Sequence, residues 1–154
     1  ASPSGIYGNI GQSNYGAAKA GIAAFTIITA MELTKYGVTV NCLAPGAYTR
    51  MTKDLPGFAG MDEETQEKMG PRWIAVTTAW LCSDAAQNVT GRIFDIVGQR
   101  VGIAEQWKLG PTAMQTDDPA DMTDVIAGLM AEAALNSDMG GHPTEGPGRP
   151  GKTI

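Results

Sequence analysis

Apolar residues recur at helical intervals over the longest regular stretch of the chain, residues 14–36. This stretch is rich in alanine, and Ile22, Phe25 and Leu33 are spaced as on one side of a helix. Gly37 follows at a position where helix ends favour glycine, because glycine adopts a left-handed backbone without strain. The pattern therefore predicts a helix over residues 14–36.

Two β-rich runs alternate with helices further along the chain. Residues 38–44 form an apolar run closed by Pro45-Gly46, as expected for a buried strand that ends in a turn. Residues 71–84 carry apolar side chains at helical spacing, and residues 91–98 again have the composition of a strand. The order helix, strand, helix, strand predicts an α/β fold.

The remaining segments are predicted as loops, one further helix and a tail. Residues 1–13 contain many small and turn-forming residues, which predicts a loop running into the first helix. Residues 47–70 are a long connection with one short polar helical stretch over 62–68, and such length is typical of a lid or binding loop. Asp118 and Pro119 are predicted to start another helix, as its N-cap and first position.

We divide the chain into three parts. Residues 1–107 hold the α/β pattern, and residues 108–135 form an extension with a helix. One apolar stripe runs along that helix, formed by Met122, Val125, Ile126, Leu129, Met130 and Ala133. Residues 136–154 are mostly polar and rich in proline and glycine, which predicts a disordered tail.

Composition and charge exclude several classes of partner. With 154 residues, 43% of them apolar and 18% charged, the chain suits one compact soluble domain. Its net charge of -5 and the lack of a basic cluster argue against nucleic acid as a partner. The apolar runs are shorter than the roughly 20 residues of a membrane span, so we predict none.

The number and spacing of the cysteine and histidine residues argue against disulfide bonds and a metal site. Cys42 and Cys82 lie in apolar surroundings without a C-x-x-C motif, and we interpret both as reduced core residues of a cytoplasmic protein. His142 is the single histidine of the sequence. A multi-histidine metal site is therefore excluded, and we expect no metal.

Candidate chemistry lies at the start of the chain, in Ser2, Tyr15 and Lys19. Tyr15 and Lys19 are four residues apart, so a helix places them on one face one turn apart. A tyrosine is a poor acid–base catalyst near neutral pH unless a nearby cation favours the phenolate, and Lys19 supplies such a cation. The Ser2 hydroxyl could hold a substrate oxygen while Tyr15 moves the proton. Alone, the Y-x-x-x-K spacing is a weak signal, because a surface tyrosine beside a lysine is the commoner reason for it.

The surrounding sequence makes the pattern specific. Residues 2–21, SPSGIYGNIGQSNYGAAKAG, resemble the active-site segment of the short-chain dehydrogenase/reductase family, with its serine, glycine-rich spacer and Y-x-x-x-K in the same order. Residues 40–46, VNCLAPG, resemble the next strand and Pro-Gly turn of that family, and residues 81–98 resemble its last helix and strand. Residues 45–52, PGAYTRMT, place Thr49 four positions after Pro45, as in the hydroxyacyl-CoA dehydrogenase domains of peroxisomal multifunctional enzymes and their bacterial relatives.

The resemblance implies a fold, a reaction and roles for individual residues. It implies the C-terminal part of a Rossmann-like, doubly wound parallel sheet, with residues 1–107 as the catalytic half of a dehydrogenase. Tyr15 would be the catalytic acid/base, Lys19 would activate Tyr15 and bind the nicotinamide ribose, and Ser2 would orient the substrate oxygen. Residues that would contact the cofactor are Tyr15, Lys19, Pro45, Gly46 and Thr49.

The same resemblance suggests the reactants. Hydride would pass between NAD or NADP, with NAD favoured, and a secondary alcohol or ketone, possible substrates being a 3-hydroxyacyl-CoA or a steroid. A homo-oligomer is expected, as is common in the family. For Thr49, an ordinary loop hydroxyl without a cofactor contact is an equally good interpretation.

The cofactor-binding half of such an enzyme has no counterpart in the sequence. Residues 146–151, GPGRPG, match G-x-G-x-x-G, but no strand precedes them and their prolines exclude a following helix. The chain alone is therefore expected to be inactive, as a fragment or as one subunit of a split enzyme whose partner chain supplies the first half. A third interpretation is a non-catalytic assembly module that uses the small-residue helix from Gly16 to Ala30 and the stripe over 122–133.

Overall fold

The computed structural model describes residues 1–105, 107–145 and 151, and the chain divides into two compact units, Ala1–Glu105 and Gln106–Ile154. The helices of the first unit are α1 (Pro3–Ile6), α2 (Ser13–Leu33), η1 (Thr34–Tyr36), α3 (Glu63–Lys68), α4 (Arg72–Leu81) and η2 (Asp84–Ala86). Its strands are β1 (Cys42–Gly46), β2 (Ile93–Val97) and β3 (Arg100–Ala104). The second unit contains η3 (Pro119–Asp121) and α5 (Met122–Glu132).

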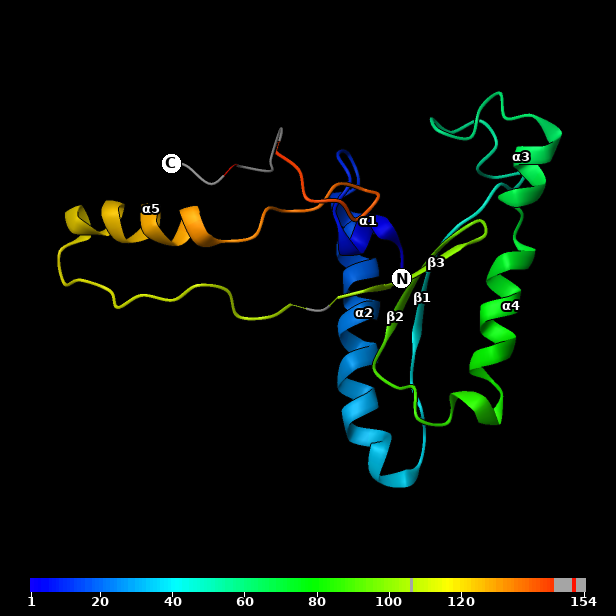
Figure 1. Ribbon diagram of the computed structural model, residues 1–154, viewed down its shortest axis with the longest axis horizontal. Coiled ribbons are helices and arrows are strands. Elements are labelled where there is room, and N and C mark those ends of the chain that lie inside the picture. Colours follow the sequence, from blue (N-terminus) through cyan, green and yellow to red (C-terminus); the bar gives the residue numbers. More distant parts are fainter. Residues whose placement is uncertain (106, 146–150, 152–154) are drawn as a thin grey trace. The chain divides into compact units, whose positions relative to one another are not determined.

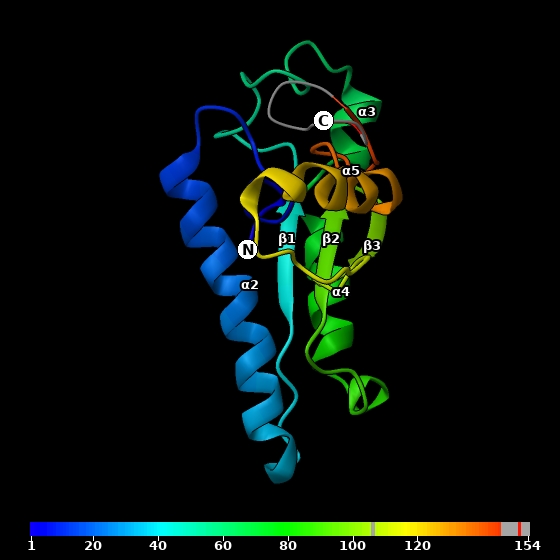
Figure 2. The same cartoon turned by 90° about the vertical axis from the view of Figure 1, so that its left-hand side faces the viewer.

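The first unit is an α/β fold around a three-stranded sheet of order β1-β2-β3. β1 and β2 are parallel, with Leu43 opposite Phe94, and the chain crosses between them through α3 and α4. Helices α2 and α4 lie on opposite faces of the sheet (Figures 1 and 2). This arrangement confirms the predicted Rossmann-like α/β fold.

Strand β3 was missed by the sequence analysis, which predicted no strand after residue 98. β3 is antiparallel to β2, with Ile96 opposite Val101, so the sheet is mixed and not purely parallel. Val101 and Ile103 on β3 are apolar although they are exposed. The sequence of β3 therefore lacks the alternation of apolar and polar residues that marks a half-buried strand. Gly98 makes the tight turn possible with a φ of +53°.

The first strand also differs from its prediction. It starts at Cys42 and not at residue 38, because the Val40 amide donates to the Thr90 hydroxyl and the Asn41 side chain bonds the Val89 carbonyl. It continues through Pro45, which lacks an N–H group. Proline is tolerated there because β1 is an edge strand of the described sheet.

Helices were predicted more accurately than strands. Helix α2 with η1 covers residues 13–36, and Gly37 ends it in a left-handed conformation with a φ of +72°, as predicted. Asp62 caps α3 by accepting a hydrogen bond of 2.8 Å from the Thr65 amide. The predicted loop over residues 1–13 was wrong in part, because residues 3–6 form α1.

The core of the first unit lies between α2 and the sheet. It contains Ala23, Cys42, Ala44, Ile93 and Ala104, with Ile6, Tyr7 and Ile27 packed against them. Phe94 and Ile96, on the alternate positions of β2, are buried as well. Both cysteines are free, but Cys82 is exposed at the end of α4, so its placement in the core was wrong.

By length and composition, the helix Ser13–Tyr36 would be able to cross a membrane. The prediction of no spanning segment rested on shorter apolar runs and did not anticipate this. The same criterion is met by core helices of water-soluble proteins, and α2 contributes Ala23 to the core of its unit. We therefore do not assign the helix Ser13–Tyr36 to a membrane on this observation.

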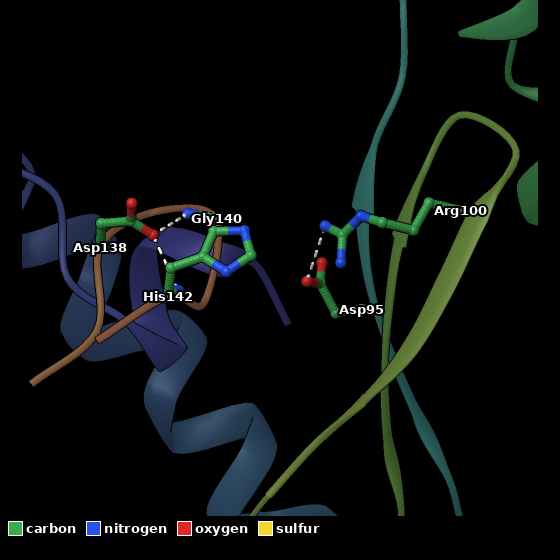
Figure 3. Close-up of polar contacts among 5 residues, drawn as sticks. All are labelled: Asp95, Arg100, Asp138, Gly140 and His142. Atoms are coloured by element: carbon green, nitrogen blue, oxygen red, sulfur yellow. Dashed lines mark hydrogen bonds and ion pairs between the residues drawn. The ribbon is translucent and has the colours of Figure 1, made fainter. Parts of the chain in front are cut away.

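The second unit begins its helical part where the sequence predicted. The Asp118 carboxylate accepts a hydrogen bond of 2.9 Å from the Ala120 amide, and Pro119 follows as the first helical residue. Asp138 accepts hydrogen bonds from the Gly140 and His142 amides, at 2.8 and 2.9 Å (Figure 3). Of the predicted tail, residues 146–150 and 152–154 lie outside the described residues, and with them nearly all of the glycine motif 146–151.

Candidate active site

Ser2 occupies the N-cap of α1. Its backbone is extended, and its hydroxyl oxygen accepts a hydrogen bond of 3.3 Å from the Ser4 amide. Its carbonyl accepts a further bond of 2.9 Å from the Gly5 amide. The buried Ser2 side chain is thus held at the start of a helical turn, while its O–H group stays able to donate.

Tyr15 and Lys19 lie in the first turns of α2. The Lys19 ammonium lies over the Tyr15 ring, 5.3 Å from its centroid, in a cation–π arrangement. Tyr15 is 44% exposed and Lys19 is half-buried. The helical spacing of four residues therefore produces the pairing of ring and cation that the sequence predicted.

Helix α1 packs against the turn of α2 that carries these two residues. A Cβ atom at Gly16, next to Tyr15, would lie 3.2 Å from the Ser4 carbonyl oxygen. Ser4 is in turn hydrogen-bonded to Ser2. The structure therefore packs α1 against the start of α2 at one corner of the unit (Figure 1). Ser2 caps α1, and Tyr15 and Lys19 lie on α2.

Strand β1 lies beside the same corner. The Ala1 ammonium group donates a hydrogen bond of 2.8 Å to the Leu43 carbonyl, so Ser2 follows directly beside this strand. Gly46 ends β1, and its carbonyl accepts a bond of 3.1 Å from the Gly98 amide. Ligands of open α/β sheets bind outside the carboxyl ends of the strands, which is where Pro45 and Gly46 lie.

Thr49 is used within its own loop. Its hydroxyl lies 3.0 Å from the Thr52 hydroxyl and accepts a hydrogen bond of 3.3 Å from the Met51 amide. The Thr52 hydroxyl also donates to the Ala47 carbonyl, at 2.7 Å. These hydrogen bonds give Thr49 a structural role in the loop after β1. Such a role is the alternative to a cofactor contact that the sequence left open.

A polar cluster of Tyr7, Asp95 and Arg100 was missed by the sequence analysis. Asp95 is only 3% exposed at the centre of β2, and one of its oxygens pairs with the Arg100 guanidinium at 3.2 Å (Figure 3). Burial and then the charge of Asp95 raise the pKa of Tyr7. The available signal was one acidic residue inside the apolar run Ile93–Val97.

Part of the donor set for a nicotinamide cofactor is present. The Lys19 ammonium has three donors for ribose hydroxyls, and within residues 1–105 and 107–145 no carboxylate forms an ion pair with it. A Cβ at Gly46 would lie 3.3 Å from the Val97 side chain, so a larger residue there would press against β2. Among the described residues, no group of three or more His, Cys, Asp or Glu could hold a metal.

Comparison with known proteins identifies the family. A family model described as enoyl-(acyl carrier protein) reductase matches residues 2–98. A hydroxyacyl-CoA dehydrogenase, ChsB1, of Mycobacterium tuberculosis is 37% identical over 79% of this chain and 37% of its own length. A peroxisomal hydratase-dehydrogenase-epimerase of Neurospora crassa is 35% identical over 81% of this chain and 14% of its own length.

A solved structure agrees with the sequence matches. The crystal structure of a short chain dehydrogenase from Mycobacterium avium superposes with a TM-score of 0.73 and 36% identity, over 88% of this chain and 43% of that chain. The chain thus spans less than half the length of the relatives it matches. These matches confirm the predicted resemblance, and the chain belongs to the short-chain dehydrogenase/reductase family.

Proposed function

We propose that this chain carries the catalytic residues of an NAD(P)-dependent oxidoreductase that interconverts a secondary alcohol and a ketone. The observation that carries the proposal is the Lys19 ammonium over the Tyr15 ring, with the start of α1 packed beside it. Membership of an oxidoreductase family supports the reaction class.

Each side chain has a role in proton transfer. Tyr15 gives its phenolic proton to the developing alkoxide when a ketone is reduced, and accepts it when an alcohol is oxidised. The Lys19 ammonium lies over the ring that gives up this proton. Ser2 donates its O–H to the substrate oxygen and so holds that oxygen near Tyr15. A bound nicotinamide supplies or accepts the hydride.

Cofactor contacts are assigned on both sides of this corner. Lys19 would bind the ribose hydroxyls, and Pro45 and Gly46 would line the nicotinamide pocket beside Tyr15. Thr49 is the least supported contact, because its hydroxyl is engaged by Thr52 and Met51. Either NAD or NADP fits this part of the site, and we retain NAD as the favoured one.

A 3-hydroxyacyl-CoA is the preferred substrate, and a steroid the second. The name of the M. tuberculosis relative, a hydroxyacyl-CoA dehydrogenase, favours an acyl thioester. An apolar loop after β1 is compatible with a bulky acyl or steroid group, since the Tyr48 and Phe58 rings lie 6.5 Å apart there and Leu55 is exposed. We place the protein in the cytoplasm, because both cysteines are free thiols.

A non-catalytic assembly role is the second candidate. It is favoured by the exposed apolar residues along α2, where Phe25 is 67% and Met31 75% exposed. A homo-oligomer or a partner chain that supplies the first half of a dehydrogenase would cover this surface.

The test is an assay of the chain alone and mixed with the N-terminal half of the M. tuberculosis relative. Oxidation of a 3-hydroxyacyl-CoA is followed by the absorbance of reduced nicotinamide, with NAD and with NADP. Turnover in the mixture that is lost in a Tyr15→Phe chain supports the oxidoreductase. A folded complex without turnover, under conditions where the intact relative is active, would support the assembly role instead.

A further inference from the structure

Glycine at position 5 lets α1 approach α2 more closely than any other residue would. A Cβ atom at Gly5 would lie 2.6 Å from the Ala20 backbone nitrogen and 2.7 Å from both the Lys19 carbonyl carbon and the Lys19 Cβ. Real Cβ contacts essentially never fall below 3.0 Å. Two of the three atoms belong to the α2 backbone, so rotating a side chain would not relieve the clash.

The close contact lies between two catalytic positions. Gly5 is in the same helical turn as Ser2, because the amides of Gly5 and Ile6 donate to the Ser2 carbonyl at 2.9 and 3.2 Å. On the other side it meets the backbone of Lys19. Any displacement of α1 at Gly5 therefore moves Ser2 relative to Lys19.

A second glycine supports the same packing from α2. A Cβ at Gly16 would lie 3.2 Å from the Ser4 carbonyl oxygen, which is a tight contact that a small shift can relieve. Gly21, five residues further along α2, has nothing within 4 Å of its Cβ position. The requirement for glycine is therefore confined to the part of α2 that faces α1.

We propose that Gly5 is a positioning residue that acts through Ser2: its bare backbone fixes the distance from the Ser2 hydroxyl to Tyr15 and Lys19. This inference rests on the proposed oxidoreductase function. Gly5 touches no reacting atom. Because α2 is a long helix and α1 a single turn, we expect a side chain at position 5 to displace Ser2 and leave the pair Tyr15–Lys19 in place.

The kinetic prediction separates positioning from folding. In the mixture with the N-terminal half of the relative, we expect Gly5→Ala to lower kcat by about a hundredfold, which a displacement of about 1 Å in an active site can cost. The KM for NAD(P) stays within about twofold, because Lys19 remains in place. Gly16→Ala gives a smaller loss and remains informative if Gly5→Ala does not fold. Gly21→Ala is the matched control, and it keeps full activity.

A double-mutant cycle tests the route through Ser2. If Gly5 acts by placing the Ser2 hydroxyl, Gly5→Ala changes kcat by no more than about twofold in a Ser2→Ala background, whereas independent effects would multiply. Multiplying effects, or a Gly5→Ala protein with normal kcat, would overturn the proposal.

Hydrogen exchange provides a readout that needs no turnover. In the 154-residue chain, the amides of Ile6 and Tyr7 should exchange faster in Gly5→Ala than in the wild type, and at wild-type rates in Gly21→Ala. If the wild-type chain mixed with the N-terminal half of the relative gives no turnover, the proposed function is contradicted, and the exchange rates alone then test whether Gly5 fixes the placement of Ser2. Unchanged exchange in Gly5→Ala overturns the positioning role.

Discussion

The proposed chemistry depends on single atoms of Tyr15 and Lys19. Tyr15→Phe removes the transferable proton and keeps the ring under the Lys19 ammonium, so kcat should fall by about 10²- to 10⁴-fold with unchanged cofactor affinity. Lys19→Ala removes the charge and the ribose donors together, so turnover and cofactor affinity should both fall. Fluorescence titration with NADH and steady-state rates measure the two effects. Equal cofactor affinity in both variants would contradict the ribose contact of Lys19.

A second effect of single residues concerns alkaline pH. Burial and the charge of Asp95 raise the pKa of Tyr7 above the value of about 10 in the unfolded chain. The raised pKa contributes stability that is complete below the unfolded value and is lost as the pH rises through the folded value. The urea midpoint of the wild type should therefore fall more between neutral and alkaline pH than that of Tyr7→Phe. Tyr36→Phe, at a 68% exposed position, serves as the control and should follow the wild type.

At the scale of elements, the sequence predicted those features that depend on interactions between residues close together in the chain. The spacing of Tyr15 and Lys19 follows from helix geometry, and Gly37 and Asp118 mark helix ends through their own backbones and side chains. Strand β3 was not predictable in this way, because its pairing with β2 and the turn at Gly98 depend on contacts across the fold. The same holds for Asp95, whose partner Arg100 becomes a neighbour only through the β2–β3 turn.

The turn at Gly98 makes a prediction at this scale. A Cβ there would lie 2.5 Å from the Lys68 carbonyl oxygen and 2.6 Å from the Met69 sulfur, and φ is +53°. Gly60 has a φ of +78° and open space around it, so it provides the matched control. Gly60→Ala should cost about 1–2 kcal/mol of unfolding free energy from backbone strain alone. Gly98→Ala should cost more, because the Lys68 backbone must also move. Equal costs in urea titrations would contradict the close packing of this turn.

At the scale of the whole molecule, the fold leaves a large apolar surface on α2. Phe25, Ile28 and Met31 are 67%, 54% and 75% exposed, whereas side chains of this kind are normally covered in a folded protein. We therefore predict that the purified chain associates in a concentration-dependent manner. Covering such side chains contributes about 1.5–3 kcal/mol each, so the Phe25→Gln/Met31→Gln double variant should associate at least about tenfold more weakly.

The control for this prediction changes equally exposed apolar residues elsewhere. Ile10 and Met51 are 81% and 91% exposed but lie in loops, so Ile10→Gln/Met51→Gln should leave association unchanged. Sedimentation over a range of concentrations compares the three proteins. If the α2 variant associates like the wild type, the contact lies on another surface. The open edge of β1 is then the next candidate, because its outer backbone groups can pair with another strand.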